Sequence, residues 1–258
     1  MRNQNYFSDE IVKDSGNENV LVHQLDLSSF GSIRKFAAII NETEERLDVL
    51  CHNAGYANYF SNAISVDGIE MTMATNHYGP FLLTHLLIDL MKRTAAKSSD
   101  PCRIVVVASK THTLSFMDPT NDYHLNPIGF FLPGLIYGNS KFANFLFTYE
   151  CARRLKDFNI TVNCLHPGVI DTGIWRNATF PLNIIFSIGK LFFKNVNEGI
   201  QTTLYVMLSD DLNEITGKYF RNCKIGRPRV DVNNISWQMT MWEASKKICQ
   251  LTPNDPRI

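Results

Sequence analysis

Residues 102–109 of the sequence are CRIVVVAS. An unbroken run of β-branched residues is typical of a strand that is buried on both faces of a parallel sheet. The run ends in Ser109, which places a hydroxyl at the carboxyl end of the predicted strand. Open α/β sheets bind their ligands at the carboxyl ends of strands, so Ser109 is a candidate functional residue.

Three further stretches also predict strands. They are NVLVHQLDL (residues 19–27), LDVLCHNAG (residues 47–55) and ITVNCLHPG (residues 160–168). Helical patterns cover about residues 28–46, 68–94, 137–157, 197–209 and 235–250. Because strands alternate with helices, we predict one α/β domain over residues 1–258, built on a doubly wound parallel sheet.

Tyr137 and Lys141 form the candidate catalytic pair. They lie four residues apart in YGNSK (residues 137–141), so on a helix their side chains share one face. An ammonium close to a phenol favours the phenolate, and we therefore expect Lys141 to lower the pKa of Tyr137 from its ordinary value of about 10. Such a tyrosine can give a proton to a carbonyl or take one from an alcohol. The alternative is a surface tyrosine and lysine on an amphipathic helix.

The order of these motifs resembles the short-chain dehydrogenase/reductase family over nearly the whole chain. The motifs that match are Asp26-Leu27, Asn53-Ala54-Gly55, Asn76, Ser109, Tyr137 with Lys141, and Pro167-Gly168 with Thr172. The sequences NHYGPFLLT at residues 76–84 and HPGV at residues 166–169 are similar to those of the retinol dehydrogenase-like branch. The resemblance implies a Rossmann-like fold and hydride transfer between NADP or NAD and an apolar alcohol or carbonyl, such as a retinoid or lipid aldehyde.

The resemblance also implies a role for each catalytic residue. Tyr137 would exchange the proton, and Ser109 would hydrogen-bond the substrate oxygen beside it. Lys141 would bind the nicotinamide ribose, and Asn76 would hold a water that links Lys141 to solvent. From the residues alone, Ser109 could instead cap the end of a strand, and Asn76 could make a structural bond to the main chain.

The remaining cofactor contacts implied by the resemblance come from three parts of the chain. These residues are Asp26, Leu27, Asn53, Ala54, Gly55, Pro167, Gly168 and Thr172. Asp26 would meet the adenine amino group, although it could instead lie at the N-terminus of the helix that Ser28 or Ser29 caps. NADP is favoured over NAD because Arg2 resembles an arginine that contacts the 2′-phosphate in NADP-preferring relatives.

One family feature is missing. No G-x-x-x-G-x-G or G-x-G-x-x-G occurs in the 258 residues, although the family begins with a glycine-rich turn that holds the cofactor pyrophosphate. We therefore expect an N-terminally truncated sheet that lacks the first two strands, with the strand at residues 19–26 beside the one at residues 47–52. The chain could be an incomplete piece, or a catalytically weak or inactive family remnant with a binding or regulatory role.

Composition bounds the partners and the location. The formal net charge is zero, which argues against a nucleic-acid partner. Six cysteines without a C-x-x-C pair favour reduced thiols, and so the cytosol or the cytosolic face of an intracellular membrane. We expect no signal peptide and no membrane-spanning segment.

Two segments and three histidines complete the expectations. Residues 180–193 are apolar but interrupted, which suits either a buried lid over the substrate or a helix in peripheral contact with a membrane. The long connection at residues 110–136 should border the substrate. His52, His77 and His166 should line the core or the pocket and not hold a metal. The oligomeric state is not predicted.

Overall fold

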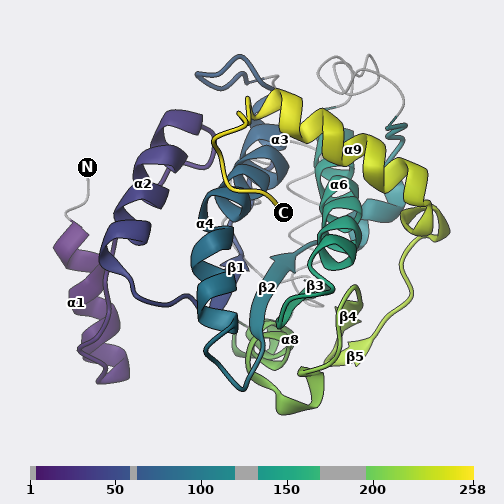
Figure 1. Cartoon of the computed structure of the whole chain (residues 1–258). Coiled ribbons are helices and arrows are strands. Elements are labelled where there is room, and N and C mark those ends of the chain that lie inside the picture. Colours follow the sequence, from purple (N-terminus) through teal and green to yellow (C-terminus); the bar gives the residue numbers. More distant parts are fainter. Residues whose placement is uncertain (1–3, 59–62, 120–132, 169–195) are drawn as a thin grey trace, which may run out of the picture.

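A five-stranded sheet forms the centre of the computed structural model, which describes residues 4–58, 63–119, 133–168 and 196–258 (Figure 1). Its strands are β1 (Val49–His52), β2 (Cys102–Val107), β3 (Ile160–His166), β4 (Tyr219–Arg221) and β5 (Lys224–Ile225), in the spatial order β1-β2-β3-β4-β5. The first four strands are parallel, and β5 returns antiparallel to β4. The predicted parallel sheet is confirmed.

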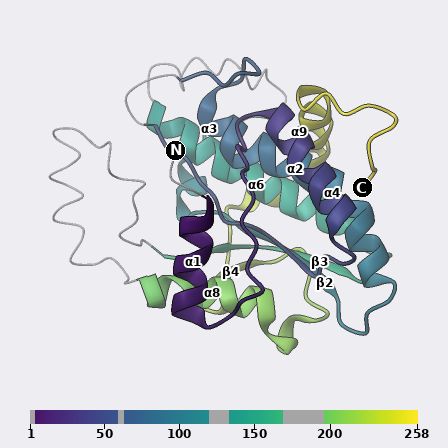
Figure 2. The ribbon, with the colours of Figure 1, turned by 90° about the vertical axis from the view of Figure 1, so that its left-hand side faces the viewer.

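Helices cover both faces of this sheet, as Figure 2 shows. The α-helices are α1 (Gln4–Ser15), α2 (Phe30–Thr43), α3 (Met71–Met73), α4 (Gly79–Ala95), α6 (Pro133–Arg154), α8 (Val196–Leu208) and α9 (Ile235–Ile248). Helices α2, α4, α6 and α9 lie on one face of the sheet, and α8 lies on the other. The doubly wound arrangement is therefore confirmed, whereas α1 was not predicted.

The central strand β2 shows why a β-branched run forms a strand here. Every residue of β2 is buried. Ile104 and Val106 join the large core under α4 and α6, whereas Val105 and Val107 join a smaller cluster that includes Val206 of α8. Successive side chains of a strand point to opposite faces, so an unbroken apolar run supplies two cores at once.

The strand predicted at residues 19–27 is wrong. Residues 16–26 form no strand, and Leu21 is 74% exposed. A strand needs a ladder partner for its backbone groups, but β1 pairs only with β2 among the described residues. The segment instead packs Leu25 and Leu27 against the core and leads into α2. The expected pairing of residues 19–26 with residues 47–52 is wrong for the same reason.

The described part of the chain has no strand before β1, where one strand was expected at residues 19–26. The loss of the first two family strands stays a prediction. The connection after β2, predicted as a loop, begins with a short 3₁₀ helix, Lys110–Leu114. Residues 120–132 of that connection lie outside the described residues.

Candidate active site

Ser109 and Tyr137 meet at the carboxyl end of β2. The side chains of the two residues are hydrogen-bonded to each other. Ser109 also caps the 3₁₀ helix Lys110–Leu114, because its Oγ accepts a hydrogen bond from the Thr111 N–H at 3.3 Å. Ser109 therefore has both of the roles that were considered for it. Its hydroxyl caps the turn at the end of β2, and the same hydroxyl faces Tyr137.

The residues between Tyr137 and Lys141 fix α6 against the loop that follows β2. A Cβ on Gly138 would lie 3.0 Å from the Thr111 carbonyl oxygen, so a glycine allows the close approach of the two backbones. Asn139 Oδ1 accepts hydrogen bonds from Ser115 Oγ at 2.8 Å and from the Phe116 N–H at 3.2 Å. These contacts hold the first turns of α6 where Tyr137 reaches Ser109.

Asn76 is buried in a π-helical turn, Ala74–Tyr78, between α3 and α4. Its Oδ1 accepts from the Tyr56 N–H at 2.7 Å, and its Nδ2 donates to the Tyr56 carbonyl at 2.8 Å. Nδ2 also donates to Ser140 Oγ at 2.9 Å. Turns of π-helix are frequent at functional sites because they redirect single side chains. Here the turn links the loop after β1 to α6.

Lys141 brings a buried positive charge to the same place. The residue is 3% exposed, and its Nζ donates to the Val107 carbonyl at 2.9 Å. A Cβ on Gly55 would lie 3.6 Å from this Nζ and 3.9 Å from Asn76 Oδ1. Burial lowers the pKa of Lys141 to about 8, because the charged form loses hydration. All four predicted catalytic residues therefore lie at one end of the sheet.

The expected effect of Lys141 on Tyr137 is not found in this structure. Burial raises the pKa of Tyr137 to about 12, and the hydrogen bond with Ser109 offsets only part of that rise. The Lys141 ammonium lies 5.5 Å from the centre of the Tyr137 ring, over its face, and is hydrogen-bonded to Val107. Desolvation of the phenolate therefore outweighs the nearby cation, and Tyr137 holds its proton at neutral pH.

The predicted cofactor residues fall into three groups. Asn53, Ala54 and Gly55 follow β1 as exposed residues, next to Lys141 through Gly55. Pro167 and Gly168 follow β3, and Gly168 has a φ of 102°, a conformation that favours glycine. Thr172, like Arg2 and residues 180–193, lies outside the described residues.

The third group is Asp26 with Leu27. Asp26 Oδ1 accepts hydrogen bonds from the Ser28 N–H at 2.9 Å and from Ser28 Oγ at 2.6 Å. Ser29 then caps α2 by accepting from the Ser32 N–H. Asp26 therefore has the helix-entry role that was its alternative, and its contact with adenine stays a prediction.

Sequence reasoning missed two residues that hold the site together. Ser140 bridges two elements, since its Oγ accepts from Asn76 and donates to the Tyr137 carbonyl at 2.8 Å. Tyr56 contributes both of its main-chain groups to Asn76. Ser140 lies inside YGNSK and could have been singled out as a small polar residue in an apolar helix, whereas no local signal marks Tyr56.

The described residues include no group of three or more histidine, cysteine or acidic side chains placed to hold a metal ion. Among the described helices, none has the length and apolar character required to cross a bilayer.

Comparison with known proteins identifies the family. The family model described as short chain dehydrogenase matches residues 3–118 and 131–181. The chain belongs to the short-chain dehydrogenase family. This is a family of nicotinamide-dependent oxidoreductases, and the retinol dehydrogenase-like resemblance is confirmed by the relatives.

Two relatives are named for retinol. Retinol dehydrogenase 14 of Mus musculus is 40% identical over 217 residues, which are 82% of this chain and 61% of that protein. Retinol dehydrogenase 11 of Homo sapiens is 37% identical over 238 residues, 92% of this chain and 71% of the relative. Short-chain dehydrogenase TIC 32 A of Brassica napus is 35% identical and covers 89% of this chain and 72% of its own length. The matched part of this chain thus spans about two thirds of the length of these relatives.

Solved structures show the same fold. An uncharacterised protein from Mycobacterium paratuberculosis superposes with a TM-score of 0.70 at 25% identity, over 96% of this chain and 82% of that one. The NADPH-bound carbonyl reductase from chicken fatty liver gives a TM-score of 0.60 at 22% identity, over 85% of this chain and 82% of its own. These likenesses support the Rossmann-type architecture.

Proposed function

We propose that this chain carries the catalytic part of an NAD(P)-dependent oxidoreductase that reduces apolar carbonyls or oxidises the matching alcohols. The observation that carries the proposal is the meeting of hydrogen-bonded Ser109 and Tyr137 with the buried ammonium of Lys141 at one sheet end. The names of the retinol dehydrogenase relatives support a retinoid or a lipid aldehyde as the substrate class.

The proton chemistry follows from the state of Tyr137. Because its pKa is raised to about 12, Tyr137 is a neutral phenol that can donate its proton to a carbonyl oxygen. Ser109 would donate a second hydrogen bond to that oxygen as negative charge develops there. The buried ammonium of Lys141 would stabilise the phenolate left behind. The protonated phenol is the form of Tyr137 that can donate a proton in carbonyl reduction.

The residues present fit the nicotinamide end of a dinucleotide. Bound nicotinamide would supply or accept the hydride. Lys141 would hold the ribose hydroxyls, while Asn53, Ala54 and Gly55 would line the cofactor, with the exposed backbone of Gly55 beside the Lys141 ammonium. Gly168 would offer a backbone without a side chain at the end of β3. Arg2 supports NADP over NAD by resemblance, and we keep that preference as part of the proposal.

Replacement of Tyr137 by phenylalanine tests the proposal. Tyr137→Phe keeps the ring and removes the transferable proton, so we expect NADPH-dependent reduction of retinal or nonanal to fall by about 10²–10⁴-fold. Tyr149→Phe is the matched control, because it makes the same change three turns further along α6. Absorbance at the nicotinamide band reports both rates. Equal turnover in the Tyr137 variant and the wild type would refute the proton-donor role.

A second candidate is a catalytically weak or inactive remnant that binds a partner. It would hold if the protein has no glycine-rich turn, a motif that does not occur in residues 1–258. Such a turn gives backbone N–H bonds to the pyrophosphate, and losing three bonds of about 1.5 kcal/mol lowers affinity roughly a thousandfold.

NADPH titration distinguishes the two candidates. A dissociation constant in the low micromolar range, measured by calorimetry on the purified chain, supports the enzyme. A constant near or above about 1 mM supports the remnant, because a micromolar site weakened a thousandfold reaches that value.

Peripheral membrane contact through residues 180–193 and a cytosol-facing location remain proposals, and the neutral net charge supports no nucleic-acid partner.

A further inference from the structure

A cavity lies away from the candidate active site. It has a volume of about 390 Å³ and is bounded by α4, α6, α9 and the tail that follows α9. Its lining includes His85, Arg154, Trp242, Lys246 and residues 251–253 and 255–258, and none of the proposed catalytic residues. Cavities of this size commonly bind small molecules.

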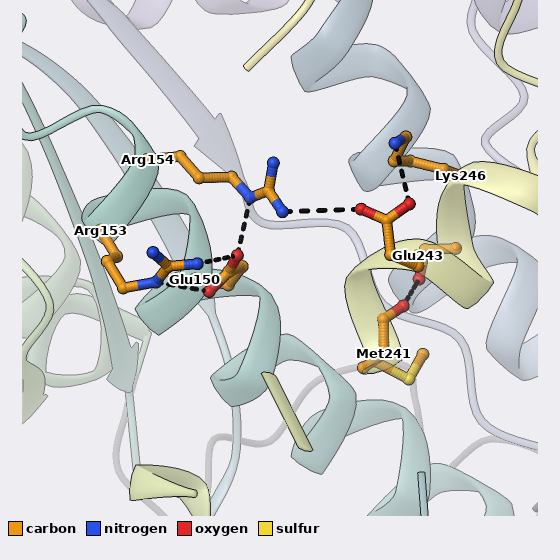
Figure 3. A network of polar contacts seen from close by, with 7 residues as sticks. Glu150, Arg153, Arg154, Met241, Glu243 and Lys246 are labelled. Carbon is orange, nitrogen blue, oxygen red and sulfur yellow. Dashed lines mark hydrogen bonds and ion pairs between the residues drawn. The ribbon is translucent and has the colours of Figure 1, made fainter. Parts of the chain in front are cut away.

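Arg154 presents a fixed guanidinium to this cavity. Its Nε donates to Glu150 Oε1 at 2.7 Å (Figure 3). The guanidinium carbon lies 4.5 Å from the centre of the Trp242 ring. Glu150 is fully buried and is also bound by Arg153 through two hydrogen bonds, at 2.9 and 2.6 Å. One carboxylate therefore serves two guanidinium groups, so Glu150 alone does not neutralise the charge at the end of α6.

Lys246 adds a second cation from α9. Its Nζ lies 2.8 Å from Glu243 Oε2, and the other oxygen of Glu243 lies 3.6 Å from Arg154 Nη2 (Figure 3). Glu243 is exposed and does not line the cavity. Two cations that share one solvent-screened carboxylate attract a further anion.

The one carboxylate side chain among the lining residues is already neutralised. Asp255 binds Arg34 through two hydrogen bonds, at 2.6 and 3.2 Å, and accepts two more from Thr252. His85 adds no charge at neutral pH, because burial lowers its pKa to about 4. The lining side chains therefore carry an uncompensated positive charge from Arg154 and Lys246, with Arg257 at the exposed edge, and the main-chain carboxylate of Ile258 adds one negative charge to the tail.

The rest of the wall is apolar. Leu251, Pro253, Pro256 and Ile258 come from the tail, and the buried Trp242 forms part of the floor. One face of the Trp242 ring stacks on Phe147 and the cation of Arg154 lies against the ring, so the indole is held in place. A bare inorganic anion would leave this apolar wall uncovered, whereas an acid with a hydrocarbon tail would cover it.

The geometry points to a binding site for a small amphiphilic carboxylate. Its head group would lie on Arg154 and Lys246, and its tail would pack on Leu251, Pro253 and Pro256. Arg154 is suited to the head because its planar guanidinium, fixed by Glu150, binds carboxylates through paired N–H groups. The site is independent of the proposed function, since it shares no residue with the candidate active site.

Calorimetric titration of the purified chain with octanoate tests the inference. We expect saturable binding, with a dissociation constant of about 1 mM or below, and much weaker binding of octan-1-ol, which has the same tail without the charge. Inorganic phosphate, which has the charge without the tail, should also bind at least tenfold more weakly.

Two lysines of α9 give a matched pair of variants. Lys246→Met should weaken octanoate binding about tenfold, because it removes a charged contact. Lys247→Met makes the same change at the next position, which is exposed and outside the lining, and should change binding less than twofold. Arg257→Met, at an exposed tail residue, provides a second variant that leaves the helices intact, and it should weaken binding about threefold.

Three results would overturn the inference. The first is that titration with octanoate gives no saturable heat of binding, although circular dichroism shows that the protein is folded. The second is equal affinity for octanoate and octan-1-ol. The third is equal effects of Lys246→Met and Lys247→Met when Arg257→Met has no effect. Tenfold selectivity for the acid would support it, together with a tenfold loss of affinity in Lys246→Met and a change of less than twofold in Lys247→Met.

Discussion

Gly79 offers a sharp test of how the segment at residues 25–27 is held. This glycine begins α4, directly after the π-helical turn that contains Asn76. A Cβ on Gly79 would lie 2.2 Å from the Leu27 carbonyl oxygen and 3.1 Å from the Ala74 carbonyl oxygen. Both contacts are with backbone, so no side-chain rotation can relieve them. Gly79 has a helical φ of −61°, and close approach alone therefore requires the glycine.

The magnitude of Gly79→Ala combines three effects. Alanine in a helix is more favourable than glycine by about 1 kcal/mol. Against this gain, forcing an extra methyl into a packed contact costs about 1–3 kcal/mol. Displacing Leu27 from the core costs about 1 kcal/mol more, since Leu27 is only partly buried. We therefore expect a net loss of about 1–3 kcal/mol in the free energy of unfolding.

Gly31 provides a control with the opposite sign. Gly31 is exposed and lies in the first turn of α2. The atom nearest to a Cβ added at Gly31 would be Ser29 Oγ, at 3.9 Å. Gly31→Ala should therefore stabilise the chain by about 0.5 kcal/mol through helix propensity and a less flexible unfolded state.

Urea unfolding followed by circular dichroism measures both changes. The midpoint should fall in Gly79→Ala and rise slightly in Gly31→Ala, with equal slopes against urea concentration. Because the displaced segment contains Asp26, amide hydrogen exchange of Ser28 and Ser29 should also speed up in the Gly79 variant. If Gly79→Ala proves as stable as Gly31→Ala, the close packing of Leu27 on α4 is wrong.

Two further predictions concern pH. Because burial lowers the pKa of Lys141 to about 8, the Lys141 side chain loses its positive charge as pH rises through 8. The affinity for NADPH, measured by fluorescence titration, should therefore fall between pH 7 and 9 in the wild type. In Lys141→Met the affinity should not change over this range. Arg34 and Thr252 lower the pKa of Asp255 to about 2, so its stabilisation is present above the ordinary pKa of 3.8 and is lost as pH falls toward 2. Arg34 is 37% exposed, so solvent screening limits the cost of Asp255→Asn at pH 7 to about 1 kcal/mol. The urea midpoints of variant and wild type should converge as pH is lowered from 4 toward 2.

Local patterns were enough to predict most of the sheet and the helices. The apolar run of β2 and the alternation of strands with helices depend on residues that are neighbours in sequence, and their periods are properties of each element alone. The spacing of Tyr137 and Lys141 is local in the same sense. These elements agree with the structure because their sequence signal and their tertiary surroundings favour the same conformation.

The strand predicted at residues 19–27 fails because a strand is not a local structure. Its β-branched residues favour an extended backbone, but a ladder also requires a partner, and β1 pairs only with β2 in the described part of the chain. The same limit explains why Ser140 and Tyr56 were missed. Asn76 bonds to groups that lie 20 and 64 residues away, and no sequence period reports such pairings.

The pKa of Tyr137 shows the same limit in electrostatics. The spacing i, i+4 gives the distance between a phenol and an ammonium, but not the hydration of either group. In the fold, both side chains lie beside β2, where burial lowers the pKa of Lys141 to about 8 and raises that of Tyr137 to about 12. The Lys141 ammonium is directed to the Val107 carbonyl, and so the phenol keeps its proton. A cation that stabilises the phenolate only after proton transfer assists the transition state more than the ground state, which is the requirement for catalysis. The prediction erred in the resting state of Tyr137, and the corrected state suits a proton donor.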